Sequence, residues 1–386
     1  MMDYNLLSPV SDILVDDIKL SHFQTLGRKL KIHTHTIKPD LEGINIAILG
    51  VLESRNSINY LEQTLNLNEI RKSFYGLFPG NWTSKIADLG DIVNGNKVQD
   101  TYFSVTRIVS SLLKRNIIPI LIGGSQDITY ANYRAYDKVK PMINIVNVDN
   151  SFDLGDSSKP ITNLSYVGKI ILEKPYNLFN YTALGFQTYF NSQEEIDLME
   201  KLYFEYERLG DISYNIKSVE PAMRDADLVT IDLNSVKSSE VSSNQKFSPN
   251  GFDGREICAI SRYAGISNMV SSFGIYEYKP SINDESTAML IAQMVWYFIE
   301  GFNCRVEDDN FKNPEEFNKY TVLVQDQALV FYKSLKTGRW WVETPHLSGV
   351  HTKKNKYALL ACMQSDYDTA VQGNIPNRWY KAYKKN

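Results

Sequence analysis

The sequence predicts an α/β fold: an open, doubly wound, mostly parallel β-sheet with helices on both faces, in three layers. Two observations support this prediction. Short, nearly continuous apolar and β-branched runs recur along the chain up to residue 276, as expected for strands buried on both faces of a parallel sheet. Segments with apolar residues at helical spacing separate these runs, and regular alternation of strand and helix is typical of α/β architectures.

Six runs have the character of buried strands, and four segments have that of helices. The expected strands are Ile44–Val51, Ile118–Ile122, Ile143–Val148, Tyr181–Phe186, Leu228–Leu233 and Val270–Tyr276. The expected helices are Tyr102–Lys114, Ser192–Leu209, Arg255–Ala264, and a last one that begins at the capping cluster Asn283–Ser286 and runs to Glu300. Ligands bind at the carboxyl ends of the strands in such sheets, so polar residues at these ends are the first candidates for a functional site.

The pattern changes after Gly301, which predicts an α/β domain over residues 1–302 and a C-terminal extension over residues 303–386. The extension contains 13 Lys and Arg against 9 Asp and Glu, a net charge of +4. Since the whole chain has a net charge of −4, residues 1–302 carry −8. Tyr320–Lys333 and Arg339–Thr344, separated by a glycine turn, predict a β-hairpin. We expect this aromatic extension to pack on the core, with a surface that docks a protein partner as the alternative.

Composition places the chain among globular proteins and excludes several classes. A pI near 5.8 argues against a protein that binds nucleic acid over its whole surface. The three cysteines are far apart, which argues against a disulfide scaffold and fits a reducing compartment. The N-terminal residues do not have the pattern of a signal peptide, and no stretch of 18 apolar residues occurs. We therefore expect a cytoplasmic location without membrane insertion.

Histidine is absent from the middle of the chain. The five histidines are His22, His33, His35, His346 and His351. The segment between residues 36 and 345 therefore works without an imidazole as base, acid or metal ligand. This distribution excludes a histidine-based catalytic triad within the predicted sheet.

Four predicted strands are followed by unusual polar sequences. These are Gly123-Gly124-Ser125-Gln126-Asp127, Asp149-Asn150-Ser151-Phe152-Asp153, Asp232-Leu233-Asn234, and Tyr276-Glu277-Tyr278-Lys279-Pro280. An Asp at a strand end is more often a cap or a turn former than a ligand. The four segments together, in this order and each after a strand, are much more specific.

Together these segments resemble the motifs of the arginase–agmatinase–formimidoylglutamase family, the ureohydrolases, over about residues 40–302. That family holds two manganese ions at strand ends through GG-D-H-S, D-A-H-x-D and S-x-D-x-D motifs. Pro249–Glu256 resembles the family's G-L-x-x-R-E segment, and Asn68–Arg71 resembles its early x-x-I-R segment. Tyr276–Pro280 resembles the E-x-N-P strand, which puts Glu277 at the position that contacts the substrate's guanidinium or formimino group.

The departures from these motifs concern the metal ligands. By the resemblance, Gln126 and Ser151 replace ligand histidines, Asn234 replaces a ligand aspartate, and Ser125 replaces the Asp of the first motif. One family ion would then have Gln126, Asp149, Asp153 and Asp232 as ligands. The other would have Asp149, Ser151, Asp232 and Asn234. Neutral hydroxyl and amide oxygens bind a divalent ion poorly, so we expect the second site to be lost and the first to suit one hard cation.

Two hypotheses follow for the function. The first is a catalytically inactive ureohydrolase-fold protein with a binding or scaffold role, in which the polar residues form a hydrogen-bonded remnant of the site. The second is a metal-dependent hydrolase of C–N bonds, nearest to formimidoylglutamase or agmatinase, with altered ligands. We expect no cofactor under the first hypothesis and one Mg²⁺, Ca²⁺ or Mn²⁺ under the second, and we assign no catalytic residue. The resemblance also allows a homo-oligomer.

Overall fold

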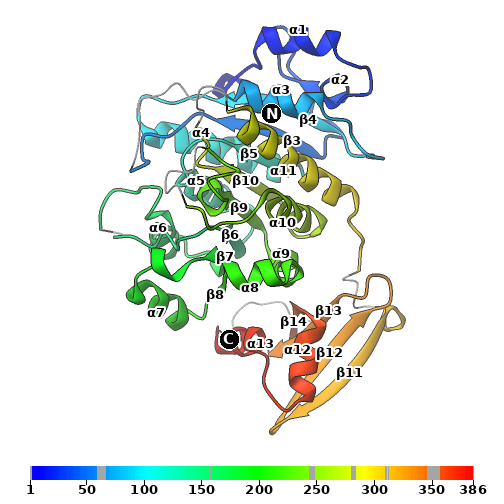
Figure 1. The fold of residues 1–386 in the computed structure, drawn as a ribbon. Helices are drawn as coiled ribbons and strands as arrows, with labels where there is room; N and C mark the ends of the chain where they lie inside the picture. The colour runs from blue at the N-terminus through cyan, green and yellow to red at the C-terminus, as the bar shows by residue number, and fades with distance from the viewer. Residues whose placement is uncertain are drawn as a thin grey trace.

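The computed structural model describes residues 2–58, 67–156, 158–242, 248–279, 284–308, 311, 313–345 and 357–385. Its main element is a ten-stranded sheet in the order β1-β4-β3-β5-β10-β9-β6-β7-β8, with β2 paired to β4 (Figure 1). All pairs are parallel except β1 with β4. The strands are β1 Leu7–Ser8, β2 Lys31–Ile32, β3 Ile46–Val51, β4 Ile86–Ile92, β5 Ile118–Ile122, β6 Ile143–Val148, β7 Leu178–Phe186, β8 Glu205–Arg208, β9 Leu228–Asp232 and β10 Ser272–Tyr276.

Helices cover both faces of this sheet, so the predicted three-layer α/β class is confirmed. Helices α3 Asn68–Gly76, α10 Gly254–Ile266 and α11 Glu285–Asn303 belong to one apolar cluster. The cluster on the other face includes α4 Val98–Leu113, α5 Ile128–Arg134 and α6 Tyr166–Leu172. The remaining helices of the sheet region are α1 Asp12–Leu20, α2 Leu26–Lys29, α7 Gln193–Lys201, α8 Leu209–Tyr214 and α9 Glu220–Asp225. None of the described helices is long and apolar enough to span a membrane.

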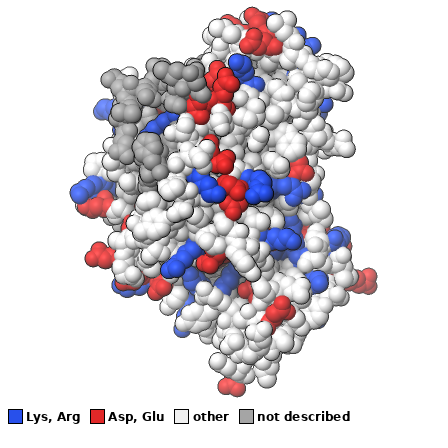
Figure 2. All heavy atoms as spheres, viewed as in Figure 1, with Lys and Arg blue, Asp and Glu red and all other residues white. Residues whose placement is uncertain are grey.

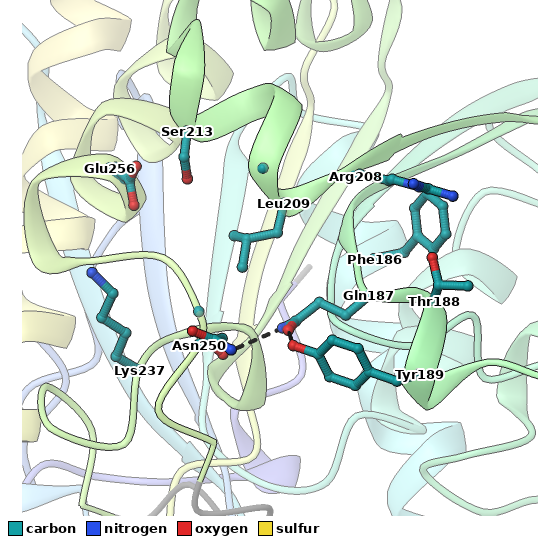
Figure 3. Close-up of a pocket in the computed structure, with 12 residues that line it drawn as sticks. Phe186, Gln187, Thr188, Tyr189, Arg208, Leu209, Ser213, Lys237, Asn250 and Glu256 are labelled. Carbon is teal, nitrogen blue, oxygen red and sulfur yellow. Dashed lines mark hydrogen bonds between the residues drawn. The ribbon is translucent and has the colours of Figure 1, made fainter.

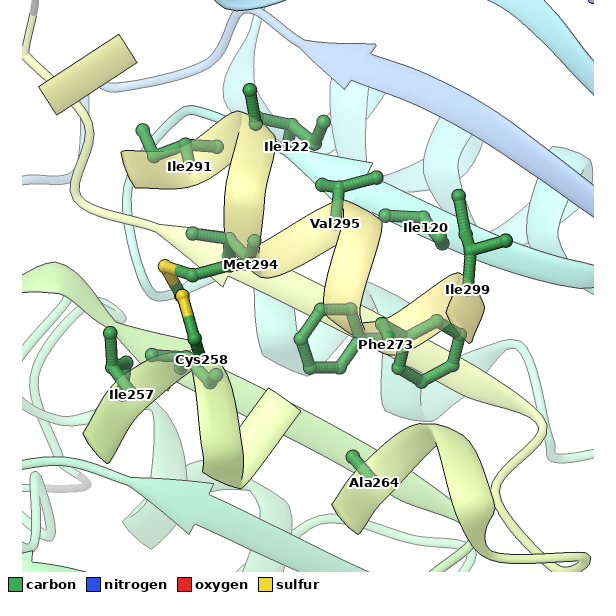
Figure 4. Packing of buried hydrophobic residues seen from close by; sticks show 14 of the residues in the cluster. Ile120, Ile122, Ile257, Cys258, Ala264, Phe273, Ile291, Met294, Val295 and Ile299 are labelled. Carbon is green, nitrogen blue, oxygen red and sulfur yellow. The ribbon is translucent and has the colours of Figure 1, made fainter. Parts of the chain in front are cut away.

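The first cluster shows why the strand runs are almost purely apolar. Side chains of β5 and β10 pack directly against α10 and α11, with the rings of Phe273 and Phe298 stacked at 4.4 Å (Figure 4). The two helices approach so closely that a Cβ on Gly265 would lie 2.1 Å from the carbonyl oxygen of Phe298. Central strands therefore have an apolar layer on each side, and alternating polar residues would be buried without partners.

The sequence-based assignment missed four strands of the main sheet, of which β4 and β8 are longer than the two-residue strands β1 and β2. The helix expected over Ser192–Leu209 ends at Lys201, because Tyr203 adopts a φ of +53° and the chain then forms β8 beside β7. Strand β4 was missed because Asp88 and Asp91 interrupt its apolar pattern. The structure buries Asp88 by pairing it with Arg71 of α3 at 3.0 Å. The Asn68–Arg71 segment thus fastens α3 to the sheet.

The extension forms a separate antiparallel sheet in the order β11-β12-β13-β14. Its strands are β11 Phe317–Val324, β12 Gln327–Ser334, β13 Trp340–Pro345 and β14 Tyr357–Cys362, followed by α12 Gln364–Val371 and α13 Asn377–Lys385. The predicted hairpin corresponds to β12 and β13, and an additional turn at Gln325, with φ +55°, divides the preceding run into β11 and β12. Trp340, Trp341 and Trp379 are buried, as expected for packing.

The extension lies below β8 and α9 in Figure 1, and arginines on both sides connect it to the α/β region. Arg224 of α9 donates to the carbonyl oxygens of Trp340 and Cys362, at 3.0 and 3.1 Å. Arg378 of α13 lies 2.8 Å from Asp225 and 3.6 Å from Glu205. Burial raises the pKa of Asp225 to about 6, and Arg378 is the main group that opposes this increase. On the face shown in Figure 2, acidic and basic side chains are interspersed.

Replacing Arg378 with Met should therefore destabilise the protein in a pH-dependent manner. Without its partner, the Asp225 carboxylate must ionise in a desolvated place, so its folded pKa should rise further above the unfolded value. The loss should be small at pH 5, where Asp225 can stay protonated, and should grow to about 1–3 kcal/mol at pH 8, below the range for fully buried pairs because Asp225 keeps some exposure. Denaturant unfolding at both pH values measures it. Arg115→Met, at an exposed position just after α4, is the control, and an equal loss at both pH values would contradict the argument.

Candidate metal site

The carboxyl ends of four adjacent strands meet at one edge of the main sheet. Strands β5, β10, β9 and β6 are neighbours in this order and are all parallel. The polar segments after these strands are therefore brought together, although residues 123 and 277 are far apart in the chain. This edge is the place where the sequence analysis expected a functional site.

Three aspartates from two of these ends converge. Asp149, Asp153 and Asp232 can each offer a carboxylate oxygen, and these oxygens all lie within 4.8 Å of one another. The three side chains are buried. Asp232 is the last residue of β9, and Asp149 directly follows β6. Asp153 adopts a φ of +53°, a conformation that is uncommon for a residue other than glycine and turns the chain back toward the cluster.

Hydrogen-bond donors from the same segments approach the carboxylates. The Ser151 hydroxyl donates to Asp153 at 2.8 Å, and its backbone N–H donates to Asp149 at 3.2 Å. The backbone N–H of Asn234 donates to Asp232 at 2.6 Å. The Ser151 hydroxyl therefore donates to a carboxylate, as expected if the polar residues form a hydrogen-bonded remnant of a metal site. These bonds offset part of the repulsion among three carboxylates and supply no positive charge.

The side chain of Gln126 donates its described hydrogen bonds to residues other than the three aspartates. Its side-chain nitrogen donates to Asn147 at 2.9 Å and to the Tyr166 hydroxyl at 3.2 Å. Asn147 in turn donates to Asp149 at 3.3 Å. The Gln126 side chain is fully buried, and its carbonyl oxygen has no hydrogen-bond partner among the described residues. A buried, unsatisfied carbonyl oxygen is costly, and it is also a ligand atom that hard cations accept.

The sequence analysis assigned no role to Asn147 or Thr230. They lie opposite each other in β6 and β9, and the Thr230 hydroxyl donates to Asn147 at 2.8 Å. The hydrogen bond from Thr230 fixes the orientation of the Asn147 amide, which contacts both Gln126 and Asp149. The signal that could have revealed them is a polar residue inside an otherwise apolar buried strand, because such a residue must find a partner in the sheet.

Glu277 lies directly after β10 and is almost completely buried. It adopts a φ of +62° and accepts a hydrogen bond of 2.9 Å from the Gln126 backbone. Burial raises the pKa of its carboxyl, while Lys279 and the Gln126 bond counteract part of that increase. Lys279 is another residue whose role was missed. Its ammonium lies 3.7 Å from the Glu277 carboxylate.

Ser125 and Asp127 flank Gln126 in the chain. Both are buried, and the Tyr102 hydroxyl of α4 donates to Asp127. Burial raises the pKa of Asp127 to about 6, and hydrogen bonds from Ser125 and Tyr102 oppose the shift. Asp127 therefore has a carboxyl group of raised pKa. No described hydrogen bond connects it to the three aspartates.

A cavity of about 420 Å³ lies beside this edge and is lined in part by the Pro249–Glu256 segment. Gln187 connects the two places, since its backbone donates to the carbonyl of Asn150 at 3.0 Å and its side chain donates to that of Asn250 at 3.3 Å (Figure 3). Lys237 and Arg208 also line the cavity. Within the segment, Asp253 caps α10 and Arg255 is exposed. Pro280, at the end of the E-x-N-P-like motif, lies outside the described residues, as do His346 and His351.

Comparisons with known proteins agree with this geometry. A model of the arginase family matches residues 54–300. A curated formimidoylglutamase of Staphylococcus aureus (strain JH9) is 25% identical over 310 residues, covering 77% of this chain and 98% of the relative. Among solved structures, a Trypanosoma cruzi formiminoglutamase with Mn²⁺ superposes with a TM-score of 0.64 at 17% identity, over 70% of this chain and 97% of the other.

A formimidoylglutamase structure from Bacillus subtilis gives a TM-score of 0.63 at 17% identity, over 70% of this chain and 91% of the other. These relatives carry the names of hydrolases. The comparisons therefore support a hydrolase more than the inactive protein expected from the changed ligand positions, and no comparison supports inactivity.

If the three aspartates bind a cation, the folded protein should be stabilised by one. Thermal unfolding in EDTA and then in millimolar Mn²⁺, Mg²⁺ or Ca²⁺ should show a rise of about 2–5 °C with at least one ion. Asp232→Asn should abolish the rise because a charged ligand is lost at constant volume. Asp156→Asn, an acid outside the cluster, should retain it. The same melting temperature in EDTA and in all three ions would exclude a cation site of useful affinity.

Proposed function

Because the chain belongs to the arginase family, we propose that it is a metal-dependent hydrolase of C–N bonds in linear amidines, of the formimidoylglutamase or agmatinase type, that uses an altered ligand set. The observation that carries this proposal is the convergence of Asp149, Asp153 and Asp232 within 4.8 Å. Three buried carboxylates this close cannot all stay ionised at low cost without a cation.

The donor set fits a hard divalent ion. It consists of three carboxylates and the amide oxygen of Gln126, which has no hydrogen-bond partner among the described residues. Oxygen-only sites with several acids suit Mg²⁺, Ca²⁺ or Mn²⁺. The first family ion would thus be held by Gln126, Asp149, Asp153 and Asp232. At the second position, Ser151 and Asn234 supply a hydroxyl and an amide, which favour one bound ion over two.

A divalent ion, when bound, supplies the acidification of water that makes a nucleophile available near neutral pH. The chain's own residues would do the rest. Glu277, buried next to the cluster, can accept hydrogen bonds from the N–H groups of an amidine and so orient its carbon. Ser151 and the backbone of Asn234 hold the carboxylates in place. Residues 36–345 contain no histidine, so proton transfer by these residues would use carboxyl groups, Lys279 or water.

The second candidate function is a binding or scaffold protein without catalysis. The observation in its favour is that Gln126, Ser151 and Asn234 occupy ligand positions of the family motifs. Under this hypothesis the extension docks a protein partner, and the cluster binds a ligand or only stabilises the fold. The cytoplasmic location and a homo-oligomeric state also remain predictions.

Catalysis can be tested by following formamide or urea release from formimidoylglutamate and agmatine in the presence of Mn²⁺. We expect release from at least one substrate, abolished by EDTA. Asp149→Asn should reduce the rate at least about 10–100-fold, the cost of disturbing even the outer partners of a metal site. Asp156→Asn is the control. A folded protein that binds Mn²⁺ but releases nothing would favour the binding protein.

Restoring the family's ligands should strengthen metal binding. The triple variant Gln126→His, Ser151→His and Asn234→Asp would supply two imidazoles and a carboxylate, and should raise Mn²⁺ affinity and bring the stoichiometry toward two ions. Titration calorimetry measures both quantities. An unchanged affinity and stoichiometry in a folded triple variant would mean that these positions do not face the ion.

A further inference from the structure

Lys279 is a positively charged residue built into the acidic site. Its ammonium lies 3.7 Å from the Glu277 carboxylate and donates a hydrogen bond of 3.2 Å to the Ser57 hydroxyl. Its side chain is only 19% exposed, and that of Glu277 is fully buried. A lysine on a flexible stem ordinarily keeps its ammonium in water, so this burial requires a compensating interaction.

The carboxylates of the site provide that interaction. The Oε2 oxygen of Glu277 has no hydrogen-bond partner among the described residues, and it is the oxygen nearest to the lysine. Asp232 and Glu277 are brought together by the sheet, since Tyr276 is in register with Asp232 across β10 and β9. Both carboxylates favour the charged form of Lys279, against the burial that lowers its pKa.

The position of this lysine relates to the changed ligand set. Of the two cation sites that the family motifs imply, one keeps three aspartates and has Gln126 in place of a histidine. The other has lost a histidine and an aspartate, at positions 151 and 234. It keeps Asp149 and Asp232, and Glu277, the substrate-contacting position by the resemblance, is buried directly after the residue in register with Asp232. A divalent ion has become poorly held at this place, and a positive charge is still required.

We propose that the Lys279 ammonium is the second cation of this site, taking the electrostatic place of a second divalent ion. The location of the first ion rests on the proposed function, whereas the ion pair of Lys279 with Glu277 does not. It follows that the wild-type chain binds at most one divalent ion. Lys279 faces the Oε2 oxygen of Glu277, so a small ammonium ion should occupy the place of the lysine's own ammonium only when the lysine is removed.

Chemical rescue tests this assignment. Lys279→Ala removes a propylammonium group, so its melting temperature should fall and should be restored by propylammonium chloride at about 10–50 mM, the usual millimolar range for a small fragment. Propanol, a neutral analogue, should not restore it. Wild type and Lys72→Ala, an exposed lysine of α3, should not respond to propylammonium. A Lys279→Ala response identical to that of Lys72→Ala would overturn the proposal.

Manganese titration provides the second arm and separates this proposal from the proposed function. Loss of a like charge should raise Mn²⁺ affinity about tenfold or more in Lys279→Ala. Lys279→Met, which keeps the volume, should show the same gain if the alanine variant does not fold. Two Mn²⁺ ions per wild-type chain, or an unchanged affinity in Lys279→Met, would overturn the role of Lys279. Rescue by propylammonium without Mn²⁺ binding in any variant would leave that role standing and refute the metal-dependent hydrolase.

Discussion

Negative charge concentrated at a buried sheet edge is the constraint on which this site depends. Asp149, Asp153 and Asp232 come together within 4.8 Å, and Glu277 lies buried beside them. In a medium of low dielectric constant, such groups repel one another strongly unless a cation or donors compensate. The donors around them, from Ser151 and the backbone of Asn234, are neutral. Lys279 brings a positive charge to within 3.7 Å of Glu277, and a bound cation is the further source of positive charge that we propose.

The fold creates this concentration through strand order. Residues 149 and 232 are far apart in the chain, but β6 and β9 are neighbours, and Asn147 and Thr230 lie opposite each other just before the ends of the strands. The same amide of Asn147 contacts Gln126, which follows β5. One internal hydrogen-bond network therefore connects three strand ends. This network includes Gln126, one of the positions at which the sequence departs from the family motifs.

The extension lies away from this edge. Arg378 of the extension contacts Asp225 of α9 and Glu205, the first residue of β8. Arg224 of α9 donates to the backbone of the extension. These residues lie at the amino end of β8 or just before that of β9, opposite the acidic cluster. Among the described residues, the extension therefore reaches the site through no direct contact. Its buried tryptophans are explained by packing within its own sheet and against α9.

The sequence by itself determined the fold class, most strands and the set of acids. Runs such as Ile118–Ile122 were predicted at their observed bounds, because a strand buried on both faces must be apolar throughout. The motif order also placed Asp149, Asp153 and Asp232 at the strand ends. Segments that depend on long-range partners were not predictable. Strand β4 tolerates Asp88 only because Arg71 pairs with it, and β8 forms only because β7 offers an edge.

Only the tertiary structure decided how the polar residues divide their roles. Ser151 contacts an acid as anticipated, whereas Gln126 is turned to Asn147 and leaves its carbonyl oxygen unsatisfied among the described residues. Lys279 looked like one residue of a motif, yet the turn at Glu277 brings its ammonium to a buried carboxylate. A sequence records which charges are present. The distance between them, which sets whether they repel, pair or hold an ion, exists only after the strands have been placed side by side.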